Sequence, residues 1–159
     1  MSKKTEEVSL RKMRWLIFLL GLTKIPLIGF VRPKLLRLND DEVELKIKLR
    51  RRSRNHLNSM YFGALAVGAD VAAGVHAFYY AAKMGRKVSF AFKGIQGEFI
   101  KRAESDVIFK TNQGKLVKEA IDKSYKNQER VNETITIAAV NSADEVVATF
   151  DMVISVRVN

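Results

Sequence analysis

One apolar stretch decides the fold, and it reads Tyr61-Phe62-Gly63-Ala64-Leu65-Ala66-Val67-Gly68-Ala69-Asp70-Val71-Ala72-Ala73-Gly74-Val75. Over residues 63–82 nearly every position is Ala, Val, Gly, Leu or an aromatic residue. A helix that is apolar on every face is typical of burial on most sides. We therefore predict a buried helix over residues 59–84, capped at its start by Asn58 or Ser59 and ended by Gly85.

Asp70 lies in the middle of this stretch and is the single acidic residue between Glu44 and Glu98, a gap that contains ten Lys and Arg residues. Burying an unpaired carboxylate is costly, so proteins seldom do it without a partner or a use. One interpretation is proton chemistry, with Asp70 as a general base or as the direct nucleophile. The alternative is a structural Asp that is hydrogen-bonded to Ser, Thr or backbone groups and fixes the core.

The composition limits the class of protein. A chain of 159 residues with 47% hydrophobic residues and nine Phe is long and apolar enough for one folded domain. The absence of Cys excludes disulfides and thiol nucleophiles and fits a cytoplasmic location, and two His residues make a His-rich metal site improbable. A net charge of +11 indicates an anionic partner: nucleic acid, an acidic membrane surface or a phosphorylated ligand.

The N-terminal segment, residues 1–30, is predicted to be helical and to precede a main domain of residues 31–159. Its apolar run, residues 15–22, follows basic residues as in a signal peptide, but Glu6 and Glu7 and the lack of a cleavage site argue against that class. The run is also too short to span a bilayer. We expect a packed amphipathic helix, with a helix on a membrane surface as the alternative.

Alternation of apolar and polar residues predicts the strands. In residues 43–50, for example, Val, Leu and Ile alternate with charged residues. The expected strands are residues 34–38, 43–50, 88–92, 99–110, 131–140 and 146–158, with an amphipathic helix over residues 113–127. Short turns between consecutive strands favour an antiparallel sheet of five or six strands wrapped around the long helix, an α+β architecture.

The start of the long helix carries a family resemblance. Residues 55–63, Asn-His-Leu-Asn-Ser-Met-Tyr-Phe-Gly, resemble the Asn-x-x-Gly-x-x-His-Gly-Gly element of hotdog-fold acyl-CoA thioesterases, of which the phenylacetyl-CoA type is the nearest characterised. Asn55, Gly63 and the helical acid Asp70 match that pattern. Asn58 replaces a Gly, Tyr61 replaces the His, and Phe62 replaces the first Gly of the pair.

The resemblance to the hotdog-fold thioesterases covers residues 30–158, and in detail the chain is most similar to an uncharacterised thioesterase-like branch of that superfamily, a domain of unknown function. The residues that carry it are the pair Arg54-Asn55, the helix start Phe62-Gly63-Ala64-Leu65 and a late helix before two long strands. The resemblance implies a hotdog fold and a homodimer, or a tetramer, in which sheets join edge to edge. It also implies a cleft between the subunits, so that Asp70 of one protomer faces loop residues of its partner.

The function implied by this resemblance is hydrolysis of an acyl-CoA-type thioester, without a cofactor or metal. Asp70 would activate water, the backbone amides of Phe62 and Gly63 would form the oxyanion hole, and Asn55 would position the substrate or the water. For Asn55, a loop residue that bonds its own backbone is the alternative. The rival function is a non-catalytic hotdog protein that binds an acyl chain, a fatty acid or acyl-CoA.

Several further residues are candidates for substrate binding. Tyr61 would donate a hydrogen bond from the position of the family His, with a packing aromatic residue as the alternative, and Asn58 would contact the substrate. Arg52 and Arg54, in the densest basic cluster, would hold the phosphates of coenzyme A, unless that cluster is simply a solvated face. Nucleic acid is an unlikely partner, because neither an RNA-binding aromatic signature nor a helix-turn-helix is present. His76 is expected in the core or at an interface.

Overall fold

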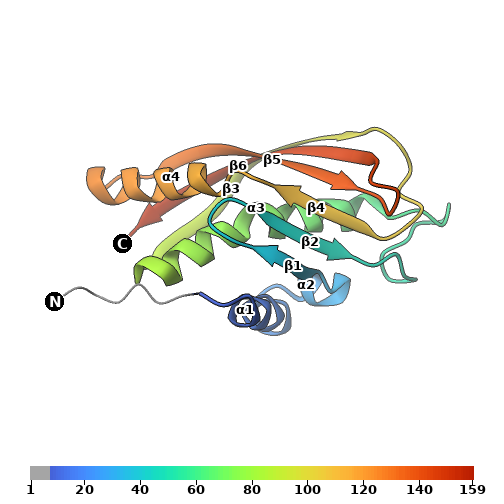
Figure 1. Cartoon of the computed structure of the whole chain (residues 1–159), viewed down its shortest axis with the longest axis horizontal. Helices are drawn as coiled ribbons and strands as arrows, with labels where there is room; N and C mark the ends of the chain where they lie inside the picture. The colour runs from blue at the N-terminus through green and yellow to red at the C-terminus, as the bar shows by residue number, and fades with distance from the viewer. Residues whose placement is uncertain (1–7) are drawn as a thin grey trace.

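The computed structural model describes residues 8–159, so the acidic and basic residues of the first seven positions lie outside the described residues. Figure 1 shows a single sheet with one long helix along it. The helices are α1 (Leu10–Thr23), α2 (Pro26–Val31), α3 (Phe62–Met84) and α4 (Gly114–Asn127). The strands are β1 (Lys34–Leu38), β2 (Val43–Ile47), β3 (Val88–Phe99), β4 (Val107–Thr111), β5 (Val131–Val140) and β6 (Val146–Val158).

The six strands form one antiparallel sheet in the order β1-β2-β4-β5-β6-β3. Helix α3 packs along one face of this sheet and contacts β2 to β6 (Figure 1). Helix α4 packs against β5 and β6. The predicted α+β architecture, with the sheet wrapped around a long central helix, is therefore confirmed. Strand β3 ends the sheet, and its outer edge has no partner strand within residues 8–159.

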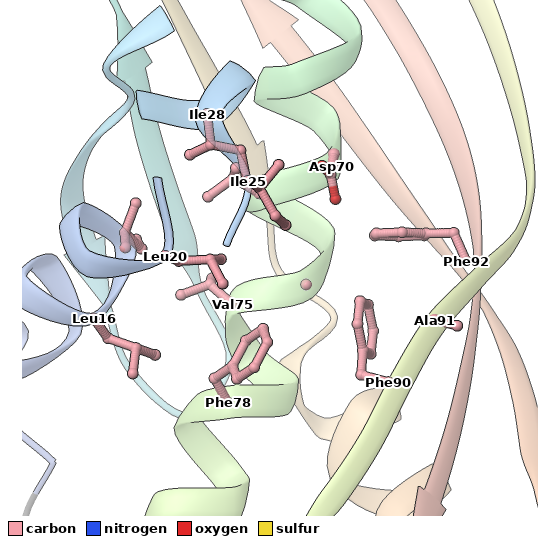
Figure 2. Close-up of a pocket in the computed structure, with 13 residues that line it drawn as sticks. Leu16, Leu20, Ile25, Ile28, Asp70, Val75, Phe78, Phe90, Ala91 and Phe92 are labelled. Atoms are coloured by element: carbon pink, nitrogen blue, oxygen red, sulfur yellow. The ribbon is translucent and has the colours of Figure 1, made fainter. Parts of the chain in front are cut away.

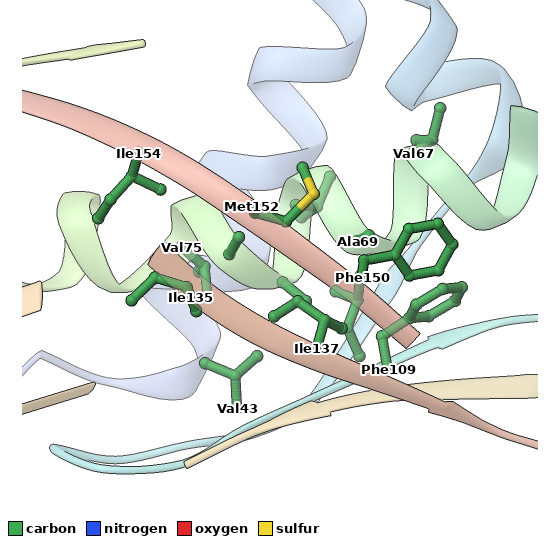
Figure 3. Packing of buried hydrophobic residues seen from close by; sticks show 14 of the residues in the cluster. Val43, Val67, Ala69, Val75, Phe109, Ile135, Ile137, Phe150, Met152 and Ile154 are labelled. Carbon is green, nitrogen blue, oxygen red and sulfur yellow. The ribbon is translucent and has the colours of Figure 1, made fainter. Parts of the chain in front are cut away.

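Small residues bring α3 close to the sheet. A side chain at Gly68 would place its Cβ 2.2 Å from the ring of Phe109, which is fully buried. Figure 3 shows Phe109, Phe150 and Met152 of the sheet facing this helix. Among residues 8–159, α3 is the one helix long and apolar enough to cross a bilayer, but most of it is buried inside the protein, as in a core helix.

The start of α3 differs from the prediction. The helix begins at Phe62, three residues later than expected, and Tyr61 at its N-cap makes no side-chain capping bond. The predicted N-terminal caps, Asn58 and Ser59, are wrong, whereas the helix ends at Gly85 as predicted. The reason is that this segment bonds elsewhere: Met60 N donates to Ala103 O and Tyr61 N to Ser53 O, each at 2.8 Å. Asn58 has a left-handed backbone (φ 60°) outside the helix.

Three predicted strands are also corrected. β3 continues to Phe99 because it pairs with β6 along its whole length, whereas we expected it to end at residue 92. The predicted strand over residues 99–110 is reduced to β4, Val107–Thr111, since residues 100–106 form a loop that reaches the start of α3. The alternation of apolar and polar residues in that loop does not come from a pleated strand. It arises because apolar loop residues such as Ala103 are buried. β2 ends at Ile47, three residues earlier than predicted.

The N-terminal helices form a layer of their own beside α3 and β1. Met13 and Ile17 are buried on the inner side of α1, and Arg14 Nε donates to Leu35 O of β1 at 2.7 Å. Gly21 and Gly29 let α1 and α2 cross, because a Cβ on Gly21 would lie 2.6 Å from the backbone N of Gly29. Helix α1 is packed against the rest of the protein, as expected. The boundary near residue 30 stays a prediction.

Replacing Gly68 with Ala tests this packing. We expect the Gly68→Ala variant to lose about 1–2 kcal/mol of unfolding free energy, because the cost of overpacking exceeds the gain in helix propensity. Urea denaturation measures the difference. Gly94→Ala is the matched control, since its Cβ would meet only an ordinary contact of 3.4 Å with Val153. Equal stability of the two variants would contradict the close approach of α3 to Phe109.

Candidate functional site

Asp70 opens into an apolar cavity of about 300 Å³ between the N-terminal helices, α3 and β3. Figure 2 shows its carboxylate on α3, between Ile25 on one side and Phe92 of β3 on the other. Asp70 is the sole ionisable side chain in this lining. The other lining residues are Leu16, Ile17, Leu20, Ile25, Ile28, Val71, Gly74, Val75, Phe78, Phe90, Ala91 and Phe92.

The carboxylate of Asp70 makes no hydrogen bond and no ion pair with any residue in the described range 8–159. The alternative interpretation, in which Asp70 is hydrogen-bonded to Ser, Thr or backbone groups, is therefore wrong within residues 8–159. Loss of water contact raises the pKa of Asp70 from 3.8 to about 6. A group with this pKa accepts and releases protons near neutral pH, which is what a general base requires.

The start of α3 forms a second candidate region. Because Tyr61 supplies no side-chain cap, the backbone amides of Phe62 and Gly63 keep the unpaired N–H groups of a first helical turn. These amides and the helix dipole favour a developing negative charge. Phe62, but not Gly63, lines an open cleft of about 520 Å³. Its lining residues are Asn55, His56, Ser59, Met60, Tyr61, Phe62, Leu65, Phe99, Lys101, Arg102 and Ala103.

Asn55 holds the loop before the helix in shape. Its Oδ1 accepts hydrogen bonds from the backbone N of Leu57 (2.9 Å), the backbone N of Ser59 (3.2 Å) and Ser59 Oγ (3.2 Å). The loop-fixing alternative is confirmed for this oxygen. The amide nitrogen of Asn55 makes no hydrogen bond to the described residues, so its N–H groups remain for a ligand in the cleft.

Aromatic rings form one wall of the cleft. The ring of Tyr61 covers Gly63, where a Cβ would lie 2.5 Å from Tyr61 Cε1. Tyr61 and Phe62 lie 4.7 Å apart between ring centroids, and Phe62 meets Phe99 of β3 edge to face at 6.4 Å. Both Tyr61 and Phe62 are largely exposed, so the wall faces solvent in a single protomer.

The cations of this cleft are not those chosen from the sequence. Arg52, Arg54 and Asn58 lie in the neighbouring loop but do not line the cleft, and Arg52 reaches toward α2, where its guanidinium lies 5.7 Å from the ring of Phe30. Lys101 and Arg102 line the cleft instead. Sequence reasoning missed them because it assigned their segment to a strand.

The structure separates the two regions within one protomer. The Asp70 cavity and the cleft share no lining residue. Gly63 and Asp70 are seven residues apart on α3, a distance of about 10 Å along the helix axis. Strand β3 connects the regions: Ala91 and Phe92 line the Asp70 cavity, and Phe99 lines the cleft. Asp70, Phe62 and Asn55 therefore do not converge on one point in a single chain.

His76 lies in the core, which is one of the two locations expected for it. It is fully buried, and its Nε2 lies 2.9 Å from Asn39 O in the β1–β2 turn. Burial lowers the pKa of His76 and favours the neutral ring. Tyr80 donates to Asp40 O in the same turn at 2.6 Å. These bonds attach the C-terminal half of α3 to the turn, and neither His76 nor Tyr80 lines either candidate region.

Comparison with known proteins identifies the fold. The family model described as "Domain of unknown function (DUF4442)" matches residues 14–156. No curated protein matches the sequence significantly. Among solved structures, PA5026 of Pseudomonas aeruginosa, a protein of unknown function described as a probable thioesterase, has 17% identity and a TM-score of 0.79, over 98% of this chain and 100% of that one.

Two further structures agree. Thioesterase HI1161 of Haemophilus influenzae has 9% identity and a TM-score of 0.65, over 96% of this chain and 92% of that one. Zebrafish thioesterase superfamily member 2 has 9% identity and a TM-score of 0.63, over 96% and 99%. At these identities the likeness concerns the fold alone. It confirms the hotdog architecture that the resemblance implied.

The raised pKa of Asp70 predicts a pH-dependent stability. Below pH 4 the carboxyl is protonated in the folded and unfolded states, while above pH 6 it is charged in both, and the folded state bears the cost of burying the charge. A pKa of about 6 instead of 3.8 corresponds to a cost of up to about 3 kcal/mol. We expect Asp70→Asn to be more stable than the unchanged protein at pH 8, by up to this amount, and to lose this advantage as the pH falls to 4.

Urea denaturation across this pH range measures the effect. Glu119→Gln, an exposed carboxylate on α4, is the matched control and should follow the unchanged protein at every pH. If Asp70→Asn also followed the unchanged protein throughout, the burial of an unpaired charge at Asp70 would be disproved.

Proposed function

Since this chain belongs to the DUF4442 family and has the hotdog fold, we propose that it hydrolyses acyl-CoA-type thioesters. One observation carries the proposal: Asp70, which has no partner in the described range 8–159, has a pKa of about 6 and opens into an apolar cavity of about 300 Å³. The apolar lining suits an acyl chain, and the carboxylate suits activation of water at the end of that chain.

The reaction needs one base and one site for negative charge. Asp70 accepts a proton from a water molecule, whose oxygen attacks the thioester carbonyl carbon. The C–O double bond opens to an oxyanion, which the amides of Phe62 and Gly63 stabilise. Collapse of this intermediate breaks the C–S bond, and the thiolate of coenzyme A leaves and takes up the proton that Asp70 received. The products are a carboxylic acid and the free thiol.

A second protomer would bring the base and the amides together. The outer edge of β3 is unpaired, and exposed Ile95 and Phe99 lie along this strand. If two copies pair these edges antiparallel about Ile95, Phe99 of one strand lies opposite Ala91 of the other. Because Phe99 lines the cleft and Ala91 lines the Asp70 cavity, this pairing places the amides of one protomer beside Asp70 of its partner. We propose a homodimer on this basis.

The nucleotide part of coenzyme A would lie over the basic rim. Lys101 and Arg102 line the cleft, with Arg54 close by in the loop that leads to the helix. Lys101 is ion-paired with Glu145, whereas Arg102 is exposed. A guanidinium binds phosphate through two parallel hydrogen bonds, so Arg102 is the phosphate ligand that we expect to matter most.

A binding protein without turnover is the second candidate. Tyr61 occupies the position that the related thioesterases fill with His. Its ring covers Gly63, whose backbone amide is one of the two proposed for the oxyanion hole. A ring in this position would favour retention of an acyl group over attack by water. Measuring both the hydrolysis and the binding of acyl-CoA separates the two functions, because a binding protein requires binding of acyl-CoA with no hydrolysis.

Asp70→Asn is the direct test of hydrolysis. Purified protein is assayed with short-chain, long-chain and aromatic acyl-CoAs while release of the free thiol is followed. We expect turnover with at least one substrate, and a loss of about 100-fold or more in kcat/KM for Asp70→Asn, because general bases contribute 100- to 10,000-fold. Since the base must be ionised, kcat/KM of the unchanged protein should rise with pH through a midpoint near 6.

Glu119→Gln serves as the control and should keep full activity. Equal rates for the unchanged protein and Asp70→Asn with every acyl chain would end the enzyme hypothesis. Binding of acyl-CoA under the same conditions would then favour the binding protein.

Complementation tests the site between subunits. Phe62→Pro removes one oxyanion amide at the first helical position, where Pro is tolerated, and Tyr61 already has the extended backbone that precedes Pro (ψ 138°). Phe62→Ala, which keeps the amide, is its matched control. We expect Phe62→Pro to lose about 100- to 1000-fold in kcat while Phe62→Ala loses much less.

When Phe62→Pro and Asp70→Asn subunits are unfolded together and refolded as a mixture, each heterodimer keeps one intact site. Activity should then recover to about a quarter of the unchanged level. Recovery of no activity, with heterodimers shown to be present, would place the base and the amides in the same subunit.

A further inference from the structure

The outer face of the N-terminal helices is apolar, although it faces solvent. On α1 the side chains of Trp15, Phe18 and Leu22 are 60%, 55% and 65% exposed, and their spacing places them on one stripe opposite the buried Met13 and Ile17. The outer face of a surface helix normally carries polar residues. Exposed apolar residues continue beyond α1 with Ile25, Leu27 and Phe30. We call these six residues the outer apolar surface.

The segment that bears this surface carries only basic residues within its described part. Residues 8–39 contain no acid, and their seven basic residues are Arg11, Lys12, Arg14, Lys24, Arg32, Lys34 and Arg37, the last of which is ion-paired with Glu42. A groove of about 460 Å³ between α1 and α2 places Arg14 and Arg32 beside Phe18 and Leu22. Guanidinium groups next to exposed apolar side chains match a ligand that presents phosphate beside hydrocarbon.

The surface is held in a fixed shape. The backbones of Gly21 and Gly29 touch where α1 crosses α2, and Arg14 attaches α1 to β1 through Leu35 O. Arg52 reaches from the loop before α3 to Phe30, donating to Phe30 O at 3.4 Å. The apolar side chains are therefore presented outward without a prior change of fold, which keeps the cost of binding low.

We propose that the outer apolar surface docks the protein onto an anionic lipid bilayer. Helix α1 has 14 residues and is about 21 Å long, too short to cross a hydrocarbon core of about 30 Å. It would lie in the plane of the interface, with Trp15, Phe18 and Leu22 among the acyl chains and with Arg14 and Arg32 at the lipid phosphates.

Charge argues against a second copy of this chain as the occupant. Two copies joined through this surface would bring two basic segments together, and residues 8–39 offer no carboxylate to pair with them. An anionic bilayer neutralises the same charges and buries the same apolar side chains.

The docking surface and the Asp70 cavity share helix α1 and the turn that follows it. Leu16, Leu20 and Ile25 line the cavity from the side of the N-terminal helices (Figure 2). On a bilayer, the cavity would therefore lie beside the hydrocarbon. If the proposed function holds, this position favours long-chain acyl thioesters that are dissolved in the membrane over short soluble ones; this consequence rests on that function, while docking itself does not.

Trp15 is the single tryptophan of the chain and reports on docking directly. The full-length protein is titrated with vesicles of phosphatidylcholine containing phosphatidylglycerol, and with vesicles of phosphatidylcholine alone, while Trp15 emission and co-sedimentation are recorded. We expect a blue shift and co-sedimentation with the anionic vesicles. Binding should weaken at high salt and on phosphatidylcholine alone, because the basic residues bind through charge.

Two pairs of variants separate the apolar and the charged contributions. Phe18→Ser with Leu22→Ser should weaken partitioning at least about tenfold, while Val146→Ser, an exposed apolar residue on β6, should not change it. Arg32→Gln should weaken binding to anionic vesicles about fivefold. Lys123→Gln on α4 is the matched charge control, since Figure 1 shows α4 far from α1.

Two results would overturn the proposal. The first is failure to bind anionic vesicles at low salt by a protein with normal sedimentation and circular dichroism. The second is a Trp15 emission that is already blue-shifted without lipid, in an oligomer that the Phe18→Ser and Leu22→Ser changes dissociate, which would make a second copy the occupant. Neither readout depends on thioester hydrolysis, so failure of docking and failure of the proposed function are distinguishable.

Discussion

Close packing of α3 on the sheet is the constraint on which the rest of the structure depends. The helix approaches because Gly68 leaves room for the ring of Phe109, and because the neighbouring Ala69, Ala72 and Ala73 are small and buried. With one side of α3 filled by the sheet, its opposite side is covered by the N-terminal helices. Asp70 opens into the gap between these layers, where it keeps a little water contact but has no partner among residues 8–159. The perturbed carboxylate is thus a consequence of how the helix is sandwiched.

The same helix keeps its amides and its acid apart. Phe62 and Gly63 lie in the first turn, under the loop of residues 100–106, whereas Asp70 is two turns further on and faces the N-terminal helices. A rigid helix cannot bring these groups together, so under the proposed mechanism one protomer would offer two half-sites. The long β3 strand lies across both of them and ends the sheet with a free edge. An antiparallel partner at this edge would bring the amides of one protomer to Asp70 of the other, so the proposed dimer would complete the site.

The N-terminal helices belong to the site as much as to the surface. Their inner residues form one wall of the Asp70 cavity, and their outer residues present aromatic and aliphatic side chains to solvent. The sequence shows one apolar run over residues 15–22 and does not reveal that its two sides have different surroundings. Only the positions of β1, β3 and α3 show which side of this apolar run lines the Asp70 cavity and which side forms the proposed docking surface.

The amino-acid sequence by itself determined the long buried helix, the isolated acid Asp70 within it, and the strands Lys34–Leu38, Val131–Val140 and Val146–Val158, because periodicity and an isolated charge are local properties. It also supported the hotdog fold through Asn55, Gly63 and Asp70. Tertiary structure decided the rest. The helix starts at Phe62 because Tyr61 N bonds to Ser53 O and Met60 N bonds to Ala103 O, and Lys101 and Arg102 join the cleft because their segment is a loop and not a strand. Met60 and Ala103 are 43 positions apart in the sequence, and no local pattern encodes which distant group will supply a partner for a given amide or charge.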